Sequence, residues 1–244
     1  MQRFYSSSQN ISADKIIISD KSQAHHIRDV LRLKIKDRVV IFDEQGNEYI
    51  SVIENLSPQK IIFKIKEQHN SNPAAKSKIT VACAIPKKCK IDDIIDKLTQ
   101  LGVDRIIPLE TARVVVKLDK QKKIARQERW EKIALNASQQ SQRHSVPVID
   151  SVKNIEEVIF HSRDYDLKII PTLIDERKSL QEVFKKSHPK NTLILIGPEG
   201  DFTPKEVNLA KRAGFIPITL GDLVLRVETA AIAVVSFMRL HENR

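Results

Sequence analysis

Cysteine and glycine are scarce in this chain of 244 residues, and each shortage excludes a class of protein. The two cysteines, Cys83 and Cys89, are too few for a disulfide framework, and no Cys or His spacing predicts zinc. The six glycines form neither GxxxxGK[ST] nor GxGxxG, so nucleotide hydrolysis and hydride transfer lose their usual support. No apolar run approaches the ~18 residues of a membrane span, so we expect no membrane partner.

Histidine ligands and targeting signals are also lacking. His25 and His26 have no partner at ligand spacing, so we expect a surface or helix-packing role and assign no metal. The opening residues, MQRFYSSSQN, lack the apolar core of a secretory signal. With so few cysteines, the simplest expectation is a cytoplasmic protein.

Positive charge, by contrast, is abundant and unevenly placed. The formal net charge is +10, and residues 113–149 hold nine lysines or arginines against three acids. A diffuse excess is compatible with a merely soluble surface, and the long helix predicted at 120–140 can be a solvated face. A concentrated patch favours a polyanionic partner, because lysine and arginine release counterions from phosphates. We therefore expect RNA contact from some of these charges.

Two domains with different patterns are expected. Residues 1–72 contain short runs rich in β-branched residues (KIIIS, RVVIFD, EYISVIE, KIIFKIKE), a DEQGNE turn and one helix at 21–31. A polar stretch, QHNSNPAAKSK, follows and reads as a linker. In residues 73–244 buried strands alternate with helices, which predicts a mostly parallel sheet covered on both faces, an α/β fold.

The stretch LILIGPEGDFTPKEV is the first motif with chemical content. A buried strand ends at Gly197, and a helix follows with Thr203 as N-cap, Pro204 at its first position and Glu206 closing a capping box. Ligands of open α/β sheets bind beyond the carboxyl ends of strands, where this loop lies. For an isolated GPEG, a well-capped turn without a ligand is the favoured interpretation.

The second motif, LGDLVLRVETAAIAVVSF, places two charges inside an apolar segment. Leu223, Val224 and Leu225 do not alternate with polar residues, so this is not a half-exposed strand. Two such loops can hold a flat ring such as adenine, and an adenosine ligand without phosphates is S-adenosylmethionine. Arg226 and Glu228 either face the reaction or form a mutual salt bridge at the helix start.

These segments carry a resemblance. IGPEGDFTPKEV and LGDLVLRVETA resemble the signature of the RsmE family of SPOUT-class ribosomal RNA methyltransferases. MQRFY and HHIRDVLRLKIKD are similar to the family's N-terminal RNA-binding barrel, which is PUA-like. KLTQLGVDRIIPLETARVVVK and RWEKIALNASQQSQRHSVPVI are similar to its central segments, so the resemblance covers nearly the whole chain.

The resemblance implies a fold, a reaction and partners. The fold is α/β: a C-terminal SPOUT-type knotted parallel sheet with helices on both faces, over residues 73–244, plus a small PUA-like β-barrel over 1–72. The reaction is S-adenosylmethionine-dependent methylation of uridine N3 in small-subunit (16S) ribosomal RNA. The implied partners are this RNA, free or in the assembled small subunit, and a second copy of the chain in a homodimer.

Candidate site residues follow from the motifs and the resemblance together. Arg226 and Glu228 are the candidate catalytic residues. The expected cofactor site comprises Thr172, Leu195, Ile196, Gly197, Pro198, Glu199, Gly200, Leu220, Gly221, Leu223, Val224, Leu225, Thr229 and Ala230. The expected RNA contacts are Arg3, Arg28, Arg32, Lys34 and Arg113.

Four positions depart from the family pattern, and two other functions remain open. Asp201 stands in place of a usual glycine, Val114 of a serine, Gln100 of a glutamate and Val227 of a threonine. One alternative function is a SPOUT enzyme that acts on another RNA or on a ribose hydroxyl. The other is a non-catalytic RNA-binding assembly factor that keeps the knot as a scaffold.

Overall fold

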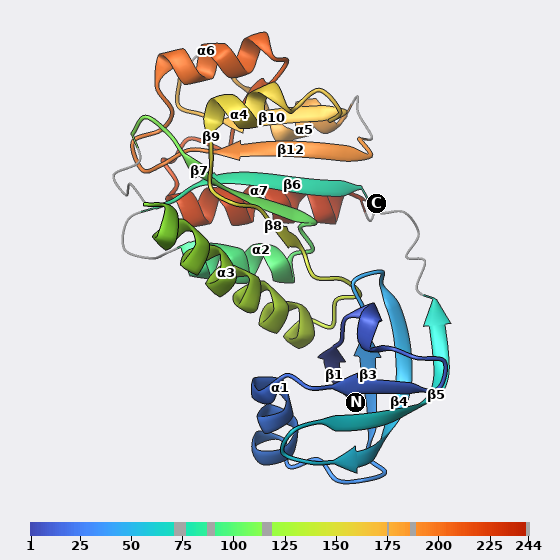
Figure 1. Ribbon diagram of the computed structural model, residues 1–244. Helices are drawn as coiled ribbons and strands as arrows, with labels where there is room; N and C mark the ends of the chain where they lie inside the picture. The colour runs from blue at the N-terminus through green and yellow to red at the C-terminus, as the bar shows by residue number, and fades with distance from the viewer. Residues whose placement is uncertain (71–76, 87–90, 114–118, 175, 186–188, 243–244) are drawn as a thin grey trace. The chain divides into compact units, whose positions relative to one another are not determined.

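The chain forms two compact units in the computed structural model, which describes residues 1–70, 77–86, 91–113, 119–174, 176–185 and 189–242 (Figure 1). Unit 1 comprises Met1–Ala74 and Ser138–Val146, and unit 2 comprises Ala75–Ala137 and Pro147–Arg244. The expected boundary between residues 72 and 73 lies outside the described residues, as does Val114.

Unit 1 is built on a curled five-stranded sheet with the order β1-β3-β4-β5-β2. Its strands are β1 (Gln2–Tyr5), β2 (Lys15–Ile18), β3 (Arg38–Phe42), β4 (Asn47–Leu56) and β5 (Ile61–Asn70). β1 pairs in parallel with β3, and the other pairs are antiparallel. The runs of β-branched residues therefore formed the strands that their alternation predicts.

One helical segment and one core complete unit 1. The helix α1 (Lys21–His25) continues as a π-helical turn over His26–Val30, in agreement with the predicted helix at 21–31. Asp20 caps its start by accepting a hydrogen bond from the Gln23 amide. Inward residues from the strands and this helix form one apolar cluster that includes Phe4, Ile27 and Phe63.

Unit 2 is an eight-stranded sheet in which every strand pair is parallel. The strand order is β11-β13-β10-β12-β6-β7-β8, and β9 pairs with β7. The strands are β6 (Lys78–Ala84), β7 (Arg105–Glu110), β8 (Val148–Ile149), β9 (Lys153–Asn154), β10 (Leu167–Pro171), β11 (Lys178–Ser179), β12 (Asn191–Ile196) and β13 (Ile216–Thr219).

Helices cover both faces of this sheet, as the continuous apolar strands require. They are α2 (Ile91–Gln100), α3 (Lys120–Gln140), α4 (Ile155–Phe160), α5 (Leu180–Phe184), α6 (Pro204–Arg212) and α7 (Val227–Glu242). Figure 1 shows α4 and α6 on one side of the sheet and α2 and α7 on the other. Gly102 ends the α2 segment at a φ of 86°, the left-handed conformation that a glycine at a helix C-terminus adopts.

The two helices that follow β12 and β13 begin where the sequence predicts. Thr203 caps α6, Pro204 is its first residue, and Glu206 completes the capping box. α7 is buried on one side only: Val227, Ala231, Val234, Val235 and Met238 are buried, while Leu240 is 69% exposed. The single chain therefore covers one side of this apolar helix fully and the remainder only in part, with Thr229 and Leu240 exposed.

None of the helices in the described residues combines the length and apolar character that crossing a bilayer needs. No cluster among these residues brings together three His, Cys, Asp or Glu side chains at metal-binding distance. The trefoil knot stays a prediction from the resemblance.

Candidate functional site

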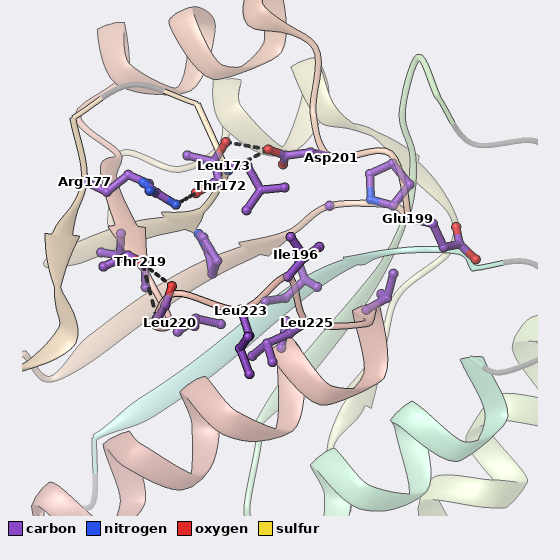
Figure 2. Close-up of a pocket in the computed structure, with 18 residues that line it drawn as sticks. Thr172, Leu173, Arg177, Ile196, Glu199, Asp201, Thr219, Leu220, Leu223 and Leu225 are labelled. Carbon is purple, nitrogen blue, oxygen red and sulfur yellow. Dashed lines mark hydrogen bonds between the residues drawn. The ribbon is translucent and has the colours of Figure 1, made fainter.

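A hollow opens at the carboxyl ends of β13, β10 and β12, which are neighbours in the sheet (Figure 2). Its walls are the loops that leave these strands after Pro171, Ile196 and Thr219. Its free space, counted to the open mouth and including solvent there, is about 600 Å³.

The order of the strands explains why the hollow forms there. The chain passes from β10 to β11 at the edge of the sheet and returns to β12 on the other side of β10. It then crosses β10 again to reach β13. The helix after β12, α6, and the helix after β13, α7, lie on opposite faces of the sheet. Loops that leave neighbouring strands toward opposite faces leave a crevice between them, the usual binding position in open α/β sheets.

Most of the predicted cofactor residues line this hollow. From the predicted set, these are Thr172, Ile196, Gly197, Pro198, Glu199, Leu220, Gly221, Leu223, Val224, Leu225 and Ala230. Leu223 and Val224 are 80% and 72% exposed although both are apolar. An exposed apolar loop at a pocket mouth favours a ligand or a partner that covers it.

Three predicted cofactor residues lie away from the lining. Leu195 is fully buried inside β12, and Gly200 and Thr229 are exposed beside the hollow. Sequence reasoning missed seven lining residues: Pro171, Leu173, Arg177, Asp201, Ile218, Thr219 and Val227. Most of them adjoin predicted residues at the same strand ends, whereas Arg177 comes from a segment that carried no signal.

The charged lining residues are Arg177, Glu199 and Asp201, which together carry a formal charge of −1. In Figure 2, Arg177 and Glu199 lie at opposite ends of the hollow, with Asp201 above it. The Arg177 guanidinium donates to the Thr172 carbonyl at 3.3 Å. A ligand with a carboxylate and a larger positive charge suits this arrangement better than a polyphosphate does.

Arg226 lies at the start of α7, between the lining residues Leu225 and Val227. Its carbonyl accepts the first helical hydrogen bond, from the Ala230 amide at 2.8 Å, and its side chain is exposed. Within the described residues no ion pair joins Arg226 to Glu228, so the salt bridge considered from the sequence is absent there. A cation is thus available at the edge of the hollow.

Glu228 and Glu199 are both close to Cys83, near the carboxyl end of β6. Burial raises the pKa of the Cys83 thiol to about 12, and the two carboxylates add to this rise. A thiol with so high a pKa stays protonated and is a poor nucleophile. Near Cys83, the side chains able to take part in a reaction are therefore the carboxylates of Glu199 and Glu228 and not the thiol.

Glycine is favoured at two of the three glycine positions in the predicted cofactor site, for different reasons. A Cβ at Gly197 would lie 3.1 Å from the buried Phe202 ring. Gly221 has a φ of 117°, which side chains rarely tolerate. At Gly200 a Cβ would meet only Arg113 Cδ at 3.5 Å, an ordinary contact, so the protein alone does not demand glycine there.

Two of the predicted RNA-binding residues form ion pairs within unit 1. The Arg3 side chain is 11% exposed, pairs with Glu48 and donates to the Arg143 carbonyl at 3.2 Å. Arg28 forms a two-pronged pair with Asp29 at 2.7 and 2.6 Å, which lowers the pKa of Asp29 to about 2. These pairings disfavour phosphate contacts, and for Arg3 they indicate a structural role.

The other RNA candidates differ among themselves. Arg32 and Lys34 are exposed in the segment after α1 and are open to an anion. Arg113, at the end of the β7 segment, donates to the Gly200 carbonyl and, at 3.4 Å, to the Phe202 carbonyl. Arg113 therefore braces the loop after β12, a role that its sequence position did not indicate.

Comparison with known families matches both parts of the chain. Residues 73–239 match the family model of the RNA methyltransferase domain. Residues 18–66 match the family model of the RNA methyltransferase PUA domain. The first match spans most of unit 2, including every residue of the hollow.

Curated relatives and solved structures agree with these matches. The ribosomal RNA small subunit methyltransferase E of Bacillus subtilis is 31% identical over 97% of this chain and 95% of its own. That of Mesomycoplasma hyopneumoniae is 33% identical, over 95% and 96%. The Neisseria gonorrhoeae enzyme of the same name, solved bound to S-adenosyl methionine, superposes with a TM-score of 0.87 at 26% identity, covering 99% and 98%.

Proposed function

The chain belongs to the ribosomal RNA small subunit methyltransferase E family, and on this premise we propose that it methylates uridine N3 in small-subunit ribosomal RNA. The methyl donor is S-adenosylmethionine, as in the solved relative that carries this molecule. The observation that carries the proposal is the hollow between the loops after β10, β12 and β13. We propose that the protein acts in the cytoplasm, where small ribosomal subunits are assembled.

The residues of the hollow fit this cofactor. Apolar side chains, among them Ile196, Ile218 and Leu225, can contact the faces of an adenine ring. S-adenosylmethionine carries one carboxylate, one ammonium and one sulfonium, so its net charge of about +1 complements the lining. When bound, it supplies a methyl group on a positively charged sulfur.

Arg226 is assigned the role of stabilising the negative charge that develops on the substrate. Uridine N3 bears a proton and is a poor nucleophile while neutral. As the proton leaves N3, negative charge spreads to the two flanking carbonyl oxygens, and a nearby guanidinium stabilises it. Arg226 is exposed in the single chain, so the dry surroundings that strengthen this effect have to come from the RNA or from a partner subunit.

Methyl transfer is the direct test of the proposed function. Purified protein incubated with radiolabelled S-adenosylmethionine and small subunits that lack the modification is expected to label the RNA. Digestion to nucleosides then separates 3-methyluridine from a ribose-methylated or other base-methylated product. Label on ribose or on another RNA supports the first alternative function. Cofactor binding without any transfer leaves the non-catalytic assembly factor.

A second copy of the chain is proposed to cover the open face of α7. Leu240 is 69% exposed there, and Ile232, Ala233 and Phe237 are only half-buried. An apolar helix that one chain leaves half uncovered is stabilised when a symmetric partner packs against it. The same partner would lie near the exposed Leu223 and Val224 at the start of this helix.

Leu240→Glu is expected to convert the dimer to a monomer, because a charge at the centre of an apolar contact costs desolvation. Sedimentation velocity at micromolar concentration measures the change. Ile124→Glu makes the same substitution at a 53% exposed position on α3, and it is expected to leave the dimer intact. Sedimentation of the unaltered chain as a monomer contradicts the proposed dimer.

A further inference from the structure

Asp201 has a backbone conformation that most residues avoid. It lies in the loop between β12 and α6 with a φ of 60°, in the left-handed region. Aspartate and asparagine visit this region more readily than other residues with a Cβ, but glycine adopts it at less cost. The Asp201 amide donates to the Pro198 carbonyl at 2.9 Å, which closes a tight turn around Glu199 and Gly200.

The Asp201 carboxylate spans two walls of the hollow. Its Oδ2 accepts hydrogen bonds from the Thr172 hydroxyl at 2.8 Å and from the Leu173 amide at 2.7 Å. Its Oδ1 accepts from the Phe202 amide at 2.7 Å. Figure 2 shows the side chain reaching from the loop after β12 to the end of β10. Both partners across this gap, Thr172 and Leu173, line the hollow as Asp201 does.

Further hydrogen bonds extend from Thr172 and from the loop after β12. The Thr172 hydroxyl, which donates to Asp201, accepts from the Ile174 amide at 3.2 Å. The Thr172 carbonyl accepts from Arg177. On the other side, Arg113 holds the Gly200 and Phe202 carbonyls. The loop after β12 is therefore held from β7 by Arg113 and from β10 by Asp201.

All three donors to Asp201 are uncharged, and in the described part of the chain no cation pairs with its carboxylate. A carboxylate accepts such bonds more strongly than a neutral oxygen does. Two of these donors are backbone amides, which need an acceptor where the strand or turn provides none. The arrangement makes Asp201 a connector between loops and not one half of an ion pair.

We propose that Asp201 is a positioning residue of the cofactor site, which holds the Thr172–Leu173 wall against the Gly197–Glu199 wall at the separation that S-adenosylmethionine needs. This inference rests on the proposed function and assigns to the carboxylate no contact with the reacting atoms. Asp201 sets the shape of the hollow, so it affects equally the binding of any ligand that contacts both walls.

Substitution of Asp201 by asparagine and by glycine distinguishes the contribution of the carboxylate from that of the backbone conformation. Asp201→Asn keeps a residue that tolerates the left-handed conformation, but one carboxylate oxygen becomes an amide that cannot accept the bonds made there. Asp201→Gly relieves the backbone and removes all three bonds. Both variants are expected to unfold at a temperature close to that of the unaltered protein. Asp164→Asn, an exposed position before β10 at the other end of the sheet, is the matched control.

Calorimetry with S-adenosylmethionine and with S-adenosylhomocysteine, its neutral demethylated product, tests the proposal. Both variants are expected to bind both molecules about 10-fold more weakly, the loss of roughly one charge-assisted hydrogen bond between loops. In turnover, KM for the cofactor is expected to rise by a similar factor, with kcat at saturation little changed. Asp164→Asn is expected to match the unaltered protein.

Two results overturn this role for Asp201. One is unchanged affinity in folded Asp201→Gly. The other is weaker binding of S-adenosylmethionine alone, because a loss confined to the charged molecule means that the carboxylate senses charge and does not set shape. If the unaltered protein binds neither molecule, the proposed function fails and not merely the role of Asp201.

Discussion

Arg226→Lys is expected to lose about 100-fold in the single-turnover rate of methyl transfer while binding S-adenosylmethionine nearly normally. This factor is about 2.7 kcal/mol, the scale of removing one preorganised donor from a transition state. Lysine keeps the charge but loses the planar set of donors that can reach a carbonyl oxygen in a fixed direction. The comparison of rate and affinity separates a catalytic role from a binding one.

The surroundings of the Arg226 side chain support this expectation. Its guanidinium has no carboxylate partner among the residues that the structure describes, while its neighbours Leu225 and Val227 line the hollow. A structural arginine would instead be paired, as Arg105 is with the buried Asp150 at 2.8 Å. Arg226→Lys with the rate of the unaltered protein would return Arg226 to an ordinary charge at a helix start.

Glu228 provides the companion experiment. Among the residues that the structure describes, no direct pair joins Glu228 to Arg226, so an orienting role has to arise when RNA or a partner subunit binds. We expect Glu228→Gln to lose less activity than Glu228→Ala, because glutamine keeps hydrogen bonding. Equal losses would instead indicate that the carboxylate accepts the N3 proton, since neither substitute can do so.

Gly197→Val is expected to weaken the binding of S-adenosylmethionine by about 100-fold or more, because an added side chain has no free space except the hollow. A Cβ at this position lies 3.1 Å from the Phe202 ring and 3.4 Å from Asp201 Oδ1. Valine has to displace that ring or project toward the ligand. Isothermal titration calorimetry measures the affinity.

The same geometry changes what we expect of stability. Gly197→Val also strains the fold, because Phe202 is fully buried in the core of unit 2. Overpacking typically costs about 1–3 kcal/mol, so a lower thermal midpoint is expected with folding retained. Gly197→Ala is expected to show a smaller loss of affinity. Gly200→Ala, which meets only ordinary contacts, is expected to show a loss at least 10-fold smaller than valine at 197.

The sequence alone determined the elements and the edge of the sheet that carries the site. β-branched runs predicted the strands, and Thr203, Pro204 and Glu206 predicted the start of α6, because these signals act within a few residues of chain. Apolar loops after two buried strands predicted the hollow, since the carboxyl ends of parallel strands share one edge. Trp130, Ala134 and Ala137 are buried on α3, as their spacing predicts.

Only the tertiary structure determined which charged side chains are available to bind RNA or a ligand. Arg3 and Arg113 resemble phosphate contacts in sequence, but Glu48 lies 45 residues from Arg3, and Gly200 lies 87 residues from Arg113. Asp201 meets Thr172 across 29 residues, so its connecting role was invisible to local patterns. A side chain's propensity depends on its neighbours along the chain, whereas its partners depend on how distant strands are ordered. The strand order β13-β10-β12 therefore decided the roles of residues whose chemistry was already evident from the sequence.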